Sequence, residues 1–192
     1  MNYSKLLINY NNLIFSLIEK SDISNIETLY QAFDKRFLSN GRVFFAGNGG
    51  SAAIASHAST DLSKISKSKN KLSTICLNEN ISLLTATAND FGYENIFTEI
   101  IKNFKINDSD MLVTISSSGN SKNINNLIDY FNNNNIDTFS LTGFDGGVSK
   151  KTSKFNIHIN SPKNYYGPIE DIHMMLFHIY VHLIKQDIEE IK

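Results

Sequence analysis

The sequence has one cysteine, two prolines and no tryptophan among its 192 residues. A single cysteine, Cys76, excludes an internal disulfide framework, so we expect the protein to work in a reducing compartment, the cytoplasm. Cys76 stands in an apolar, strand-like run without neighbours of the kind that activate a thiol. It is therefore interpreted as an unreactive core residue.

The sequence also has no excess of basic charge, because it contains 18 lysines and arginines and 19 aspartates and glutamates. Without a broad basic surface, nucleic acid is not an expected partner. No apolar run approaches the length of a membrane span, and the N-terminus lacks a signal-peptide pattern, so no membrane partner is expected. The content of 41% hydrophobic and 19% charged residues predicts one globular domain over residues 1–192.

The N-terminal part, residues 1–40, carries two helical patterns. Residues 3–19 place apolar side chains at helical spacing, and a second helix is expected from a cap at Asp22 or Ser24 to about Leu38. Two helices before the first strand cannot both bury their apolar faces on a small sheet. We therefore expect them to pack on each other and on another subunit at an oligomer interface.

After residue 41, apolar runs alternate with helical patterns. The expected strands cover residues 42–46, 72–77, 110–115, 138–142 and 155–159. The expected helices cover residues 51–62, 80–88, 93–104, 120–132 and 167 to about 189. This alternation predicts an α/β fold, a three-layer αβα sandwich with a five-stranded parallel sheet, preceded by the two N-terminal helices. Ligands of such sheets bind outside the carboxyl ends of the strands.

A glycine-rich loop follows the first expected strand and has the sequence Gly47-Asn48-Gly49-Gly50-Ser51. Glycines permit positive φ and a close ligand approach, and N–H groups at the start of the next helix attract anions. The loop is neither a P-loop nor a dinucleotide fingerprint, because it lacks their residues and spacing. A tight turn without a ligand is the alternative, but Asn48 and Ser51 add more donors than a turn needs.

A second polar loop follows the third expected strand and has the sequence Ser116-Ser117-Ser118-Gly119-Asn120-Ser121. Four hydroxyls and a helix start without any lysine or arginine suit a phosphate monoester bound by neutral donors. A serine-rich helix cap is the alternative. Because the serine loop has more hydroxyls, we expect it to hold phosphate, while Asn48, Gly49 and Ser51 face the rest of the ligand.

Two expected helices each carry one histidine and one carboxylate. His57 and Asp61 are four residues apart and share a helix face. Glu170 and His178 are eight residues apart and also share a face, with their Cα atoms about 12 Å apart. The four side chains could form a His₂/carboxylate₂ metal site or could act as acid and base. Three further histidines are interpreted as structural, namely His158, His173 and His182.

Taken together, these motifs resemble the phosphoheptose isomerases of the SIS (sugar isomerase) fold, over nearly the whole chain. The resemblance rests on residues 47–53, His57, residues 89–92, residues 116–121, residues 141–143 and the segment 170–178. The serine loop alone marks only the SIS fold. The glycine loop and the two histidines narrow the resemblance to this branch.

The resemblance implies a homotetramer with active sites at subunit interfaces. It implies that phosphate contacts Ser116, Ser117, Ser118 and Ser121, and that Asn48, Ser51 and Asp90 contact sugar hydroxyls. It also implies zinc or acid–base roles for His57, Asp61, Glu170 and His178, with Asp61 and His178 as the catalytic pair. Glu170 is expected to contact the substrate as well. The implied reaction converts sedoheptulose 7-phosphate to D-glycero-D-manno-heptose 7-phosphate through an enediol, which supplies heptose for lipopolysaccharide or capsule.

The chain departs from the family pattern at three positions. Asp61 stands where the family usually has Glu, Glu170 where it has Gln, and Gly167 where an acidic residue is common. These departures leave open an isomerase of another sugar phosphate. A third possibility is a non-catalytic SIS adaptor that binds a protein such as the replication initiator, but an adaptor has no need of the histidine–carboxylate set.

Overall fold

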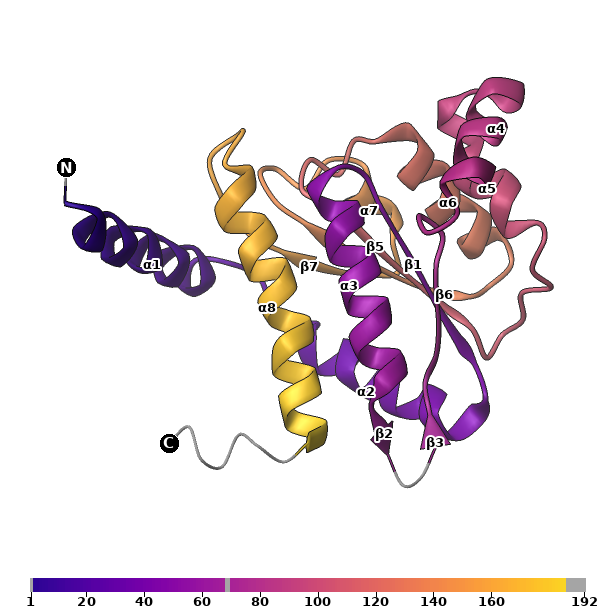
Figure 1. Ribbon diagram of the computed structural model, residues 1–192, viewed down its shortest axis with the longest axis horizontal. Helices are drawn as coiled ribbons and strands as arrows, with labels where there is room; N and C mark the ends of the chain where they lie inside the picture. Colours follow the sequence, from indigo (N-terminus) through magenta and orange to yellow (C-terminus); the bar gives the residue numbers. More distant parts are fainter. Residues whose placement is uncertain (1, 68–69, 186–192) are drawn as a thin grey trace.

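The computed structural model describes residues 2–67 and 70–185, and it has the layered α/β architecture predicted from the sequence (Figure 1). The elements are α1 (Tyr3–Glu19), α2 (Ile26–Ser39), β1 (Arg42–Gly47), α3 (Gly50–Lys64), β2 (Ser66–Lys67), β3 (Asn70–Lys71), β4 (Ser73–Cys76), α4 (Ile81–Phe91), η1 (Tyr93–Asn95), α5 (Ile96–Ile101), β5 (Met111–Ser116), α6 (Lys122–Asn133), β6 (Asp137–Thr142), α7 (Ser149–Thr152), β7 (Phe155–His158) and α8 (Tyr166–Lys185). Across these ranges, no helix has the length and apolarity that a membrane crossing requires.

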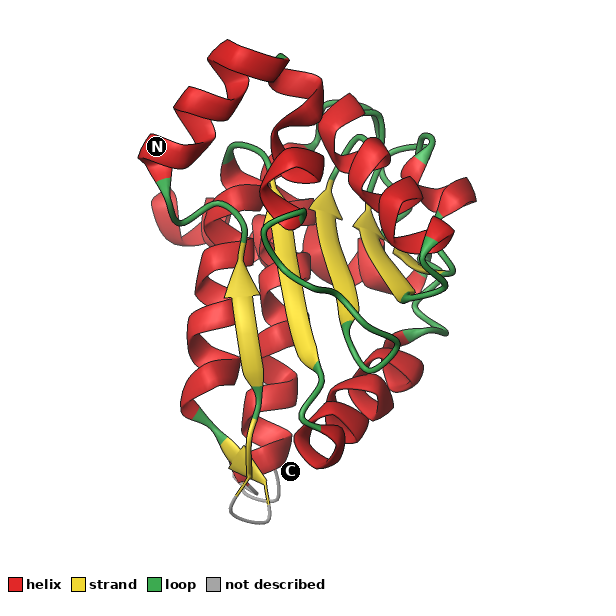
Figure 2. Cartoon of the chain, turned by 90° about the vertical axis from the view of Figure 1, so that its right-hand side faces the viewer, coloured by secondary structure: helices red, strands yellow, loops and turns green. Residues whose placement is uncertain are grey.

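The central sheet has five parallel strands in the order β4-β1-β5-β6-β7. Successive side chains of a strand point to opposite faces. In β1, Val43 and Phe45 pack with α2, α3 and α8, while Phe44 and Ala46 pack with α5 and α6. Both faces of the sheet are therefore covered by helices, as a buried parallel sheet requires (Figure 2).

The first helix, α1, lies beside α8 at one edge of the molecule (Figure 1). Leu17 packs with Ile169 and Ile172 of α8 in a third, smaller apolar cluster. The hydroxyl of Tyr10 donates a hydrogen bond to the carboxylate of Asp171 at 2.5 Å. The rest of α1 leaves several large apolar side chains exposed, namely Tyr3, Leu6, Leu7, Ile8 and Phe15.

The starts and ends of several helices differ from those predicted from the sequence. Helix α2 begins after Asn25, because Asp22 instead accepts hydrogen bonds from the backbone and hydroxyl of Ser24 in a turn. The expected helix over residues 93–104 is divided into η1 and α5. The polar connection after α3 contains the short antiparallel pair β2–β3, and the short helix α7 was not predicted. The predicted end of the last helix near Glu189 lies outside the described residues.

Candidate active site

The two polar loops meet at the carboxyl edge of the sheet because β1 and β5 are neighbouring strands, with Gly47 opposite Ile115. They enclose a pocket of about 310 Å³. Its lining residues are Asn48, Gly49, Gly50, Ser51, Ile115, Ser116, Ser117, Ser118, Ser121, Tyr166 and Glu170. The structure thus brings together both loops and Glu170, as expected, and adds Tyr166.

Two glycines shape the pocket wall at the start of α3. Gly49 precedes α3 with φ of 56°, a conformation that other residues rarely adopt. At Gly50, the position of a Cβ atom is taken by the carboxylate at the end of the Glu170 side chain, which comes from α8. These two glycines let the start of α3 approach α8 closely and leave backbone N–H groups at the pocket.

The serine loop turns tightly between β5 and α6, with the amide of Gly119 donating to the carbonyl of Ser116 at 2.9 Å. The hydroxyl of Ser117 is buried without a hydrogen-bond partner among the described residues. Ser121 is the N-cap residue of α6, yet its side chain makes no capping hydrogen bond. A buried hydroxyl and an unused cap at a helix N-terminus fit an anion that accepts several hydrogen bonds.

Glu170 is the acidic group of the pocket. Burial raises the pKa of its carboxyl, and the neighbouring carboxylate of Asp171 raises it further. The protonated form is therefore favoured more than in a solvent-exposed glutamate.

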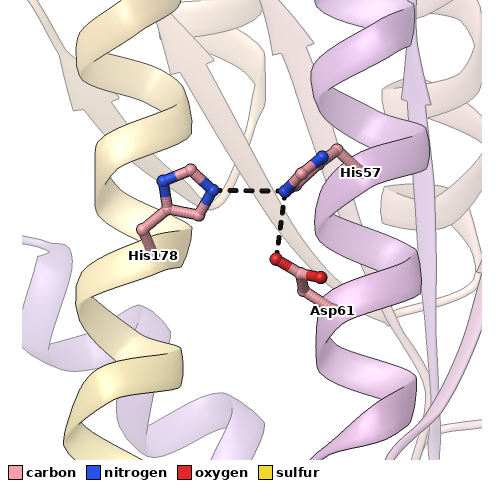
Figure 3. Close-up of side chains that lie close together, drawn as sticks. All are labelled: His57, Asp61 and His178. Carbon is pink, nitrogen blue, oxygen red and sulfur yellow. Dashed lines mark hydrogen bonds and ion pairs between the residues drawn. The ribbon is translucent and has the colours of Figure 1, made fainter. Parts of the chain in front are cut away.

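A second group of candidate site residues lies farther along α3 and α8 (Figure 3). Nε2 of His57 is 3.0 Å from Oδ2 of Asp61 and 3.2 Å from Nε2 of His178. Potential ligand atoms of these three residues all lie within 4.8 Å of one another. Two imidazole nitrogens and a carboxylate oxygen that converge in this way form a donor set suited to zinc.

Glu170 does not join this cluster. The cluster found among the described residues consists of His57, Asp61 and His178. Glu170 lies two helical turns before His178, and helical side chains lean toward the N-terminus, so the Glu170 carboxylate lies at the pocket instead. The structure thus supports Glu170 as a pocket residue and differs from the expected four-residue metal set.

Asp90, unlike the other expected substrate-binding residues, lies outside the pocket lining. It is exposed near the end of α4, where its carboxylate accepts a hydrogen bond from Asn89 at 3.0 Å. The histidines interpreted as structural divide into two kinds. His158 and His173 are buried beside Thr142, and His182 is exposed at the end of α8.

Two asparagines that the sequence analysis did not single out hold the glycine loop. Asn78 accepts from the amide of Gly47 and donates to its carbonyl, at 3.2 and 2.9 Å. Asn123 exchanges two side-chain hydrogen bonds with Asn48. Asn78 directly follows an expected strand, which was a usable signal, whereas the contact of Asn123 depends on tertiary packing.

Comparison with known proteins agrees with this geometry. A family model described as the SIS domain matches residues 8–143. The phosphoheptose isomerase of Helicobacter pylori (strain ATCC 700392 / 26695) is 37% identical over 147 residues, covering 76% of this chain and 75% of its own. That of Leptospira biflexa serovar Patoc (strain Patoc 1 / Ames) is 32% identical over 169 residues, covering 86% and 85%.

Solved structures share the fold over nearly the full chain. A phosphoheptose isomerase from Francisella tularensis has a TM-score of 0.81 at 22% identity, covering 97% of this chain and 100% of its own. Phosphoheptose isomerase GmhA from Neisseria gonorrhoeae has a TM-score of 0.81 at 24% identity, covering 96% and 100%. Because the family match and the sequence relatives span most of the chain, the protein belongs to the SIS domain family and, within it, to the phosphoheptose isomerases.

Proposed function

We propose that the protein is an isomerase that converts D-sedoheptulose 7-phosphate to D-glycero-D-manno-heptose 7-phosphate. The observation that carries this proposal is that α3 and α8 both begin at the pocket and both continue to the histidine cluster. From Gly50 to His57 the helix rises about 10 Å. An extended seven-carbon ketose with phosphate on C7 has a comparable length, so it can reach from the pocket to the cluster.

In this proposal, the serine loop binds the phosphate and the glycine loop binds sugar oxygens. The hydroxyls of Ser116, Ser117, Ser118 and Ser121 and the N-terminus of α6 are the phosphate donors. Asn48, Gly49, Ser51 and Glu170 contact the sugar chain. Without a lysine or arginine in the serine loop, binding depends on many neutral hydrogen bonds rather than on a single ion pair.

The reacting end of the ketose, C1 and C2, then lies at the cluster. One side chain takes a proton from C1 while the C2 carbonyl oxygen gains a proton, which gives an enediol. A proton is then returned to C2 as the O1 hydroxyl loses its proton, so the atoms balance without an external oxidant. We assign these proton transfers to Asp61 and His178, which both face Nε2 of His57. The same three residues would hold zinc, and bound zinc would polarise the C2 carbonyl as a Lewis acid.

We further propose that the protein is a homotetramer with active sites at its subunit interfaces. The support is the exposed apolar surface of α1, which no other described element covers, next to the helix that carries Glu170 and His178. In this proposal, the heptose phosphate that the enzyme makes would supply heptose for lipopolysaccharide or capsule.

The decisive assay measures turnover of a panel of ketose phosphates by the purified protein, before and after chelation and with zinc restored. We expect the highest kcat/KM with sedoheptulose 7-phosphate, and no turnover of unphosphorylated sedoheptulose. His178→Ala is expected to abolish turnover without changing the mass of the oligomer. A higher kcat/KM with another ketose phosphate, or full turnover by His178→Ala, contradicts the substrate or the site assignment respectively.

A further inference from the structure

The carboxamide of Asn48, in the glycine loop, is held on two sides by other elements. On the α6 side, its Nδ2 donates to Oδ1 of Asn123 at 2.9 Å, and Nδ2 of Asn123 donates to its Oδ1 at 3.0 Å. From η1, the hydroxyl of Tyr93 donates to the same Oδ1 at 2.9 Å. Asn48 is thus bonded to two side chains from different parts of the chain.

The direction of these hydrogen bonds is fixed by the backbone of α6. The amide of Ile124 donates to Oδ1 of Asn123 at 3.0 Å. A backbone N–H cannot accept, so the oxygen of Asn123 must face Ile124, and its nitrogen must face Asn48. Asn48 must then present its oxygen to that nitrogen. Neither amide can be flipped without placing two donors or two acceptors against each other.

This arrangement leaves Asn48 with one group to offer a ligand. A carboxamide has two donor hydrogens and two acceptor lone pairs. Tyr93 and Asn123 occupy both lone pairs, and Asn123 accepts one hydrogen. Asn48 lines the pocket, so its second N–H is the group that remains for a bound molecule. Asn123 is only 2% exposed, so water does not readily replace it.

We propose that Asn123 is a positioning residue that fixes Asn48 as a hydrogen-bond donor toward an oxygen of the phosphosugar. The inference rests on the proposed function, since it assigns a polarity to one contact of the same pocket. The asparagine pair also joins the loop after β1 to the helix after β5, and so holds the sugar-binding and phosphate-binding loops at a fixed separation.

The first test is the KM and kcat of Asn123→Ala and Asn123→Asp with sedoheptulose 7-phosphate. We expect KM to rise about tenfold at nearly unchanged kcat, because a ground-state hydrogen bond is misplaced. The carboxylate introduced by Asn123→Asp would still accept from Ile124, and an acidic residue is favourable near a helix N-terminus, so this variant is expected to fold. Asn133→Ala is the matched control, since this asparagine is exposed at the far end of α6.

The second test combines Asn123→Ala with Asn48→Ala and reads the dissociation constant of sedoheptulose 7-phosphate by calorimetry. If Asn123 acts through Asn48, its removal has no further effect once Asn48 is alanine. The inference is overturned if the two substitutions raise the dissociation constant independently, so that their fold-changes multiply in the double variant. It is also overturned if KM is unchanged in both Asn123 variants. Binding without turnover by the unsubstituted protein contradicts only the proposed reaction, whereas absence of phosphosugar binding contradicts both.

Discussion

Asp61 is one methylene shorter than the glutamate of the family pattern, yet its carboxylate is already 3.0 Å from Nε2 of His57. It has room for a longer chain, since its side chain is 26% exposed. Asp61→Glu is therefore expected to keep or raise kcat with sedoheptulose 7-phosphate, while Asp61→Ala eliminates turnover. The measurements are kcat and the zinc content of each purified variant.

The neighbouring Thr60 gives the control for these variants. Among the described residues, its hydroxyl bonds only the carbonyl of Ser56 within the same helix, so Thr60→Ala is expected to leave kcat unchanged. If Asp61→Glu instead lowers kcat about 10²-fold, the size of loss that a misplaced catalytic group can cause, the site is built for the shorter side chain.

His173 is the buried titratable residue that links pH to stability. Burial lowers its pKa from 6.5 to about 4, its Nδ1 has no hydrogen-bond partner in the described chain, and its Nε2 lies 3.4 Å from the carbonyl of Thr142. His173 of the unfolded chain takes up a proton near pH 6.5, whereas the buried His173 of the folded chain does so only near pH 4. The contribution of neutral His173 to the free energy of unfolding is therefore fully present above pH 6.5 and is lost as the pH falls toward 4. We expect a loss of about 2 kcal/mol between about pH 7.5 and about pH 5 from this residue.

The check is urea unfolding of the protein and of His173→Gln at the two pH values. Glutamine retains a donor for Thr142 and does not titrate, so the variant is expected to lose less stability on acidification. His182→Gln changes an exposed histidine of the same helix and should keep the original pH dependence. An equal acid sensitivity of His173→Gln and the unsubstituted protein would contradict this account.

At the scale of the elements, the sequence predicted those helices and strands whose local hydrophobic pattern matches their burial in the structure. All five strands of the parallel sheet were predicted, because each is a short apolar run between turn residues. The two loops were also predicted to share one edge, since ligand-binding loops follow the carboxyl ends of parallel strands. Helix α7 was missed because four residues, mostly polar, show no helical periodicity.

The parts of the site that depend on tertiary contacts could not be predicted. Spacing along α8 predicted that Glu170 and His178 share a face, but not that the Glu170 carboxylate lies against Gly50 of α3. Similarly, nothing near Asn123 in the sequence indicates a partner 75 residues earlier. Helical spacing defines a face, whereas the partner of that face is set by how the helices pack.

The attachment of α1 to α8 gives a prediction for one element. The hydroxyl of Tyr10 donates to Asp171, and burial together with this hydrogen bond raises the pKa of Tyr10 to about 12. Tyr10→Phe removes the hydroxyl and is expected to lower the free energy of unfolding by about 1 kcal/mol. Tyr3→Phe is the control, since Tyr3 is 76% exposed. Equal unfolding free energies of the two variants would show that Tyr10 does not fasten α1.

At the scale of the whole molecule, α1 is a helix of 17 residues of which Leu17 alone is buried in the described chain. The two main apolar clusters fill the two faces of the sheet, and only the inner side of α1 contributes to the third. Leu7 and Phe15 are 63% and 68% exposed, and the opposite face of α1 packs on α8. An exposed apolar surface of this kind is typical of interaction sites and supports the proposed subunit interface.

Leu7→Lys with Phe15→Lys is therefore expected to reduce the mass in solution from a tetramer to a smaller species, because charges replace buried apolar contacts at the proposed interface. Light scattering after size-exclusion chromatography measures the mass, and circular dichroism checks that the chain stays folded. Val148→Lys is the control, an exposed apolar side chain next to α7. If active sites lie at the interfaces, kcat/KM falls together with the mass, whereas an unchanged tetramer would place the interface elsewhere.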